Sequence, residues 1–181
     1  MVMAVPAGVE LSALEETLGL GLGGGGERRY RQGDGGVPVL QTNNRPDLAG
    51  LTTIASHLVK VAKKEELLGT TPEKSAIVQQ WLEYRVTHID QCNTQDDKRT
   101  ILKDLNCYLK DKVYLAGNNF TLADIMLYNG LHPIVAGLTH EDREKHVNVS
   151  RWFNHIQHYP GVRQHSAAVI FMKNRLYPTV H

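Results

Sequence analysis

The sequence predicts an α/β unit followed by an all-helical unit, and three observations support this division of its 181 residues. The first part joins a short helical pattern to one strand-like run, Val-Pro-Val-Leu at residues 37–40, through a glycine-rich stretch. A polar run at residues 69–72, Gly-Thr-Thr-Pro, is typical of a linker. Beyond it, apolar residues recur at helical spacing nearly to the end. We therefore expect a domain over residues 1–65, a linker over 66–72 and a helical domain over 73–177.

The N-terminal part begins with a predicted helix. Leucines recur at helical spacing over residues 9–18, and Gly19 follows where a left-handed cap would lie. The glycine-rich residues 19–36 are expected to form a flexible surface loop, with at most a weak strand near Tyr30. Pro38 argues against a central position for the strand that contains it, because proline cannot donate to a ladder.

Helical spacing returns at Leu51, where one face of the pattern is apolar. Thr71 can cap, and Pro72 can open, a helix over about residues 73–90. A further apolar stripe over residues 101–109 predicts the next helix.

The strongest local signal is Phe-Thr-Leu-Ala-Asp-Ile at residues 120–125. Thr121 and Asp124 have the spacing of a capping box, in which each residue bonds the backbone of the other. The residues that follow are apolar on nearly every side, so this helix is expected at the centre of the helical domain. Pro133 is expected to end or kink it.

The last predicted helix begins near Asn148 and carries Trp152 and Phe153 into the core. Pro160-Gly161 stops this helix and is expected to start a further helical segment through Val169. These patterns together predict a bundle of about five helices.

Composition excludes several classes of function. Twenty basic residues against 19 acidic residues give a formal net charge of +1, which argues against direct nucleic-acid binding. The two cysteines lack zinc or redox spacing and suit a reducing compartment. His155 and His158 have no third ligand at fitting spacing, so no metal site is predicted. Without a membrane-spanning run or a basic leader, the expected location is the cytosol.

These elements resemble the glutathione-transferase superfamily, which joins a thioredoxin-like half to a helical half. The 120–125 motif matches the capping box of that superfamily's central helix, and Val37-Pro38 matches the place of its cis-proline. Longer strings resemble a more particular group, the scaffold proteins of the multi-aminoacyl-tRNA-synthetase complex, over roughly residues 9–177. Those strings are residues 37–44, 51–60, 77–87 and 148–153. The resemblance implies a truncated thioredoxin-like N-terminal domain followed by an all-helical C-terminal domain.

The resemblance raises the question of enzymatic activity. A glutathione transferase needs a hydroxyl or thiol after its first strand, but the candidate strand at residues 2–5 precedes Pro6-Ala7-Gly8. The superfamily also uses a Glu/Gln-Ser pair after Pro38, where this chain has Gly50-Leu51. We therefore expect no catalytic residue and no cofactor, and a structural role for Pro38. A glutathione-dependent transferase remains the first alternative, and a small RNA-binding accessory protein the second.

The resemblance implies that a protein with this fold and no catalytic residues is a scaffold. The implied partners are the glutathione-transferase-like domains of methionyl-tRNA synthetase and glutamyl-prolyl-tRNA synthetase, with other members of the complex. A nuclear pool linked to the DNA-damage response is also implied. Arg151 matches a second pairing face on the late helices. The residues that match the first pairing face are Gln41, Leu51, Gln79, Gln80 and Arg85. The last three of these are expected on the outer side of the 73–90 helix.

Overall fold

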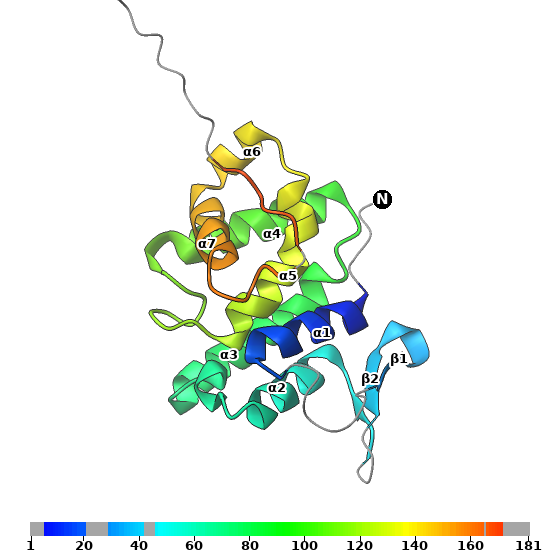
Figure 1. Ribbon diagram of the computed structural model, residues 1–181. Coiled ribbons are helices and arrows are strands. Elements are labelled where there is room, and N and C mark those ends of the chain that lie inside the picture. Colours follow the sequence, from blue (N-terminus) through cyan, green and yellow to red (C-terminus); the bar gives the residue numbers. More distant parts are fainter. Residues whose placement is uncertain (1–5, 21–28, 42–45, 165, 172–181) are drawn as a thin grey trace, which may run out of the picture.

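The computed structural model describes residues 6–20, 29–41, 46–164 and 166–171. The strand expected at residues 2–5 lies outside this part of the chain. In Figure 1 the sheet and the helices α1 and α2 lie below a bundle that is centred on α5. The elements of the N-terminal part are α1 (Ala7–Leu18), β1 (Arg29–Gln32), the short 3-10 turn η1 (Asp34–Gly36), β2 (Pro38–Gln41), β3 (Leu48–Ala49) and α2 (Leu51–Val61).

The three strands form one antiparallel sheet in the order β1-β2-β3. The weak strand expected near Tyr30 is therefore present as β1. The position of β2 corrects the sequence prediction, because this strand is central. Pro38 is tolerated there because it is the first residue of the strand, paired with Gln32 in the register. Gly19 caps α1 in the left-handed conformation, as predicted, with a φ of 76°.

The remaining elements are helical, and α5 is the longest of them. Pro133 lies inside α5, which continues to Ala136, so of the two expected outcomes, an end or a kink, the end is excluded. The bounds are η2 (Glu65–Leu68), α3 (Pro72–Tyr84), the π-helical turn η3 (Arg85–Ile89), α4 (Gln95–Tyr108), η4 (Leu109–Asp111), α5 (Leu122–Ala136), α6 (His140–Lys145) and α7 (Val147–Gln157). As predicted, Thr71 caps α3 by accepting from the backbone N–H of Lys74, and Pro72 opens the helix.

One continuous apolar core joins the N-terminal helices to the bundle. Leu11 and Leu14 of α1, Leu58 of α2 and Phe153 of α7 all have 1% exposure or less and belong to this core. Trp152 is equally buried, which confirms the predicted inward face of α7. None of the described helices combines the length and apolar composition that crossing a bilayer requires.

The start of α5 is held by a buried carboxylate. Asp124 Oδ2 accepts from the backbone N–H of Thr121 at 3.0 Å, and the predicted capping box is present. Its Oδ1 accepts from the Leu115 backbone at 3.0 Å and from Trp152 Nε1 at 2.9 Å. Burial raises the pKa of Asp124, while these hydrogen bonds act in the opposite direction. The residue therefore ties α5, α7 and the preceding loop together.

Candidate partner-binding site

A cleft of about 720 Å³ lies between the sheet and the bundle. Pro38, Gly50 and Leu51 line one wall, and Pro133 and Ile134 of α5 line the other. The side chains at the wall beside Pro38 are apolar or absent. This wall therefore offers a thiol or an α-amino acid group no side-chain donor.

The backbone beside Pro38 is also engaged within the chain. The Val37 carbonyl accepts from the Gly33 N–H at 2.8 Å, and the Val37 N–H points to the Asp34 carbonyl at 3.5 Å. An extended ligand that paired with Val37 would have to displace these bonds. No cis peptide bond occurs in the described residues, so the expected cis-proline at Pro38 is corrected.

Arg85 corrects a second expectation, because it does not lie on the outer side of its helix. It is 5% exposed, is the first residue of η3, and continues the buried face of α3 seven residues after Val78. Its Nη2 donates to Glu10 Oε2 at 3.0 Å, and its Nε donates to the Met126 carbonyl at 3.1 Å. Its Nη1 forms an ion pair with Asp90. The guanidinium therefore joins α1, α5 and the turn after α3.

Two local features make room for this buried ion network. A Cβ on Gly130 would overlap Arg85 Nε, so only glycine lets the side chain cross α5 here. The π-helical turn is closed by a hydrogen bond from the Asp90 N–H to the Arg85 carbonyl at 3.0 Å. Burial raises the pKa of Glu10, while the neighbouring Arg85 and a contact with Asn129 lower it.

The other residues expected on the first pairing face lie on three different elements, β2, α2 and α3. Leu51 is 7% exposed and packs in the core, so it offers little surface to a partner. Gln41 is exposed at the end of β2, and Gln79 and Gln80 are exposed on α3. Arg151 lies on α7, on the far side of α5 from the sheet (Figure 1). The structure thus brings Leu51 and Arg85 together at the cleft and leaves the three glutamines and Arg151 on the surface.

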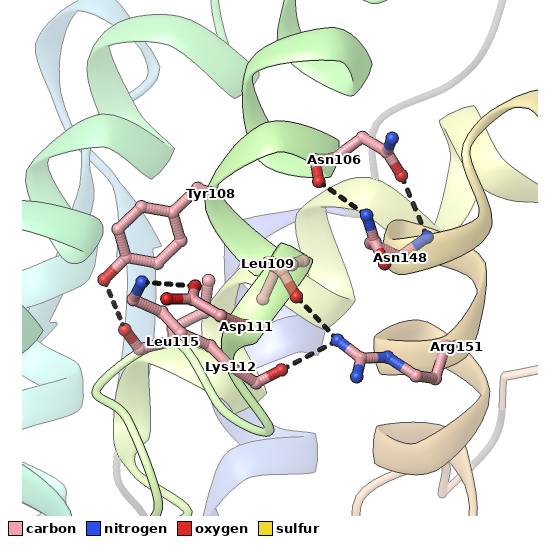
Figure 2. Close-up of polar contacts among 8 residues, drawn as sticks. All are labelled: Asn106, Tyr108, Leu109, Asp111, Lys112, Leu115, Asn148 and Arg151. Carbon is pink, nitrogen blue, oxygen red and sulfur yellow. Dashed lines mark hydrogen bonds and ion pairs between the residues drawn. The ribbon is translucent and has the colours of Figure 1, made fainter.

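Arg151 is exposed, yet its side chain is held in one orientation. Figure 2 shows its Nη2 donating to the carbonyl of Leu109 at 2.6 Å and to the carbonyl of Lys112 at 2.8 Å. These carbonyls lie at the end of the helical stretch formed by α4 and η4, where a cation is favoured. Within the described residues, Arg151 Nε and Nη1 make no hydrogen bond. Nη2 is therefore fixed by the chain, while Nε and Nη1 remain free to donate to a partner.

The same two helices exchange a second set of contacts (Figure 2). Asn106 of α4 accepts through Oδ1 from the N–H of Asn148 at 2.9 Å and from the N–H of Val149 at 3.3 Å. Asn148 Nδ2 returns a bond to the Asn106 carbonyl at 3.0 Å. Asn106 therefore caps the start of α7, while Arg151 of α7 satisfies the end of α4 and η4.

Aromatic side chains extend the surface next to Arg151. Tyr114, in the loop before α5, lies 5.3 Å from His155 of α7 between ring centroids, and its hydroxyl is 3.1 Å from His155 Nε2. Phe120 stacks on Tyr159 with centroids 3.8 Å apart. We call Tyr114, Phe120, Arg151, His155 and Tyr159 the α7 face. It combines a cation with partly exposed rings, a composition common at the centres of protein interfaces.

Metal binding has no candidate in the part of the chain that is described. His155 meets Tyr114, and His158 Nδ1 lies 2.7 Å from the Asn154 carbonyl. No group of three or more possible ligands gathers among the described residues.

Comparison with known proteins first defines the class. A glutathione transferase, YghU from Streptococcus pneumoniae, superposes with a TM-score of 0.66, covering 90% of this chain and 79% of its own at 20% identity. The chain therefore has the glutathione-transferase fold. A protein-family model described as nuclear-export cofactor Arc1p matches residues 74–160.

Sequence relatives define the family. Human eukaryotic translation elongation factor 1 epsilon-1 is 61% identical over 175 residues, which cover 97% of this chain and 99% of the human protein. The chain belongs to the eukaryotic translation elongation factor 1 epsilon-1 family. A more distant relative, mouse bifunctional glutamate/proline–tRNA ligase, is 27% identical over 125 residues, covering 68% of this chain and 8% of the ligase.

Sequence reasoning missed several residues that shape these surfaces. Asn106 and Asn148 carry no motif, because each acts on a helix remote in sequence. Glu10, which is 4% exposed, gave only a weak signal in the sequence, its position next to the buried Leu11. Arg85 gave a stronger signal, since its spacing from Val78 predicts an inward position.

Proposed function

We propose that this chain is a non-catalytic scaffold that associates with aminoacyl-tRNA synthetases. The family membership supports this proposal, as does the distant relationship to a glutamate/proline–tRNA ligase over 68% of the chain. The cleft adds a chemical argument, because the wall beside Pro38 presents no side-chain donor for a thiol.

The observation that carries the proposal is the conformation of Arg151. Two bonds from Nη2 to main-chain carbonyls fix the guanidinium at the surface, so little side-chain freedom is lost when a partner binds. A carboxylate on the partner would accept a charge-assisted hydrogen bond from Nε or from Nη1, the two nitrogens that the described part of the chain leaves free. The aromatic members of the α7 face supply apolar area around this contact.

The proposed partners are the glutathione-transferase-like domains of methionyl-tRNA synthetase and glutamyl-prolyl-tRNA synthetase. One would bind the α7 face, and the other a face that includes Gln41, Gln79 and Gln80. These three side chains are exposed and suit a polar interface rim. Two separate faces would let the chain bridge two synthetases in one assembly. We further propose that the scaffold lies in the cytosol and that a nuclear pool of it acts in the DNA-damage response.

Co-purification tests this function. The full chain is mixed with each tagged synthetase domain and with both together, and the mass of each complex is measured by light scattering. We expect a ternary complex, and we expect Arg151→Ala to lose one partner selectively while keeping the other. Equal binding of both domains by Arg151→Ala would contradict the assignment of the α7 face.

A glutathione-dependent transferase is the competing function, because the cleft itself persists. A glutathione-affinity column and a conjugation assay distinguish the two. We expect the chain to pass through the column and to show no turnover. Retention on the column together with turnover would overturn the scaffold proposal.

A further inference from the structure

The end of the described chain, residues 166–171, is an extended segment and not the helix that the sequence predicted. In Figure 1 it is the red trace that crosses in front of α5 and reaches α6. Extended backbone outside a sheet needs partners for its polar groups. In this segment those partners come from the side chains of three helices.

Gln157 of α7 provides two of the bonds. Its Nε2 donates to the Val169 carbonyl at 3.0 Å, and its Oε1 accepts from the Val169 N–H at 3.0 Å. A side-chain amide that bonds both groups of one residue acts as a neighbouring β-strand would. Gln157 is 4% exposed, and its position is therefore set by packing.

The other two bonds come from α5 and α6. His132 Nε2 lies 2.8 Å from the Ala167 carbonyl, and Arg143 Nη1 donates to the Ile170 carbonyl at 2.8 Å. Arg143 Nη2 also donates to the Ala136 carbonyl at 3.1 Å, which holds its guanidinium in place. Main-chain groups at three positions of the segment are thus recognised, whatever side chains those positions carry.

The last three side chains of the segment alternate between inside and outside. Val169 is 7% exposed, Ile170 is 77% exposed, and Phe171 turns back toward the core. The Phe171 ring lies 5.9 Å from the Phe153 ring between centroids, with the Arg143 guanidinium 5.8 Å from its centre. The surface beneath therefore selects an aliphatic residue and, two positions later, an aromatic one.

We propose that α5, α6 and α7 form a peptide-binding groove for an extended aliphatic-x-aromatic segment, and that residues 166–171 of the same chain are its reversible occupant. Three side chains, His132, Arg143 and Gln157, bind the peptide backbone, while the sites of Val169 and Phe171 give specificity. A tethered occupant has an effective concentration near the millimolar range, so it excludes weak competitors until it is released.

The first test releases the occupant in the full-length chain. Val169→Asp places a charge in the buried site, whereas Ile170→Asp changes the exposed neighbour and serves as the matched control. We expect amide hydrogen exchange over residues 166–171 to become at least tenfold faster in Val169→Asp and to stay near the wild-type rate in Ile170→Asp. Equal rates in the two variants would overturn the proposal.

The second test supplies the occupant in trans. A synthetic peptide with the sequence of residues 166–171 is titrated into each full-length variant, and binding is followed by NMR. We expect the peptide to bind Val169→Asp at least tenfold more tightly than the wild type. Adding Gln157→Leu to Val169→Asp is expected to weaken binding about tenfold, since two hydrogen bonds are lost. Matching affinities for wild type and Val169→Asp would overturn the groove, as would full binding without Gln157 in a folded chain.

Discussion

Arg85 and Arg151 show how one side chain serves opposite purposes in two regions of this molecule. Arg85 is 5% exposed, and its nitrogens are directed to Glu10, Asp90 and a carbonyl of α5. Arg151 is exposed and uses only Nη2 within the described chain, which leaves Nε and Nη1 free to donate. We infer that the first arginine holds the two parts of the fold together and that the second prepares a surface for a partner.

Removing Arg85 is expected to have the largest effect. Arg85→Ala leaves Glu10 buried without its cation, so the free energy of unfolding should fall by about 3–5 kcal/mol. Urea denaturation measures this loss. Arg99→Ala is the control, since the Arg99 side chain is 79% exposed and its loss should change stability by less than about 0.5 kcal/mol. A loss below about 1 kcal/mol for Arg85→Ala would show that the network contributes little.

Gly130→Ala tests the same network without removing a charge. The added methyl would overlap Arg85 Nε and push the guanidinium out of line, which should cost roughly 1–3 kcal/mol. Gly137→Ala is the matched control in α5's C-cap, where a Cβ makes ordinary contacts at 3.5 Å or more. Thermal unfolding of both variants decides the point, and equal melting temperatures would contradict the close approach of Arg85 to α5.

The α4–α7 exchange next to Arg151 predicts a smaller effect. Asn106→Ala removes the side chain that caps the start of α7, so the free energy of unfolding should fall by roughly 1 kcal/mol. Asn118→Ala, at an exposed loop position, serves as its control. If the two variants were equally stable in urea, the capping role of Asn106 would be refuted.

The pH dependence of stability gives a last prediction, of which the direction is set by Glu10. Because burial raises the pKa of Glu10, the folded chain keeps a proton that the unfolded chain has already released. Folding then takes up a proton, so this group's contribution to stability falls as pH rises from about 4.3 through the raised pKa. Glu10→Gln cannot titrate and should lack this part of the fall. Parallel stability–pH curves for the two proteins would contradict the raised pKa.

Local signals predicted much of the fold. The leucine spacing before Gly19 predicted the start of α1 to within two residues, because an amphipathic helix shows a regular spacing of apolar residues in the sequence. The Thr121–Asp124 spacing predicted the start of the buried helix, because a capping box acts within one turn.

Contacts between distant residues could not be predicted in this way. α6 is composed of charged residues and histidine, so it has no apolar stripe from which a helix could be predicted. Residues 166–171 are extended because side chains from three other helices bind their backbone. Glu10 and Arg85 lie 75 positions apart, and neither carries a signal for the other.

The most direct test measures the affinity of Arg151→Ala for each synthetase domain beside its free energy of unfolding, with Arg99→Ala as control. We predict that one of the two affinities falls at least tenfold while the free energy of unfolding changes by only about 1 kcal/mol. Unchanged affinity for both domains would contradict the account, as would a loss of binding that accompanies unfolding.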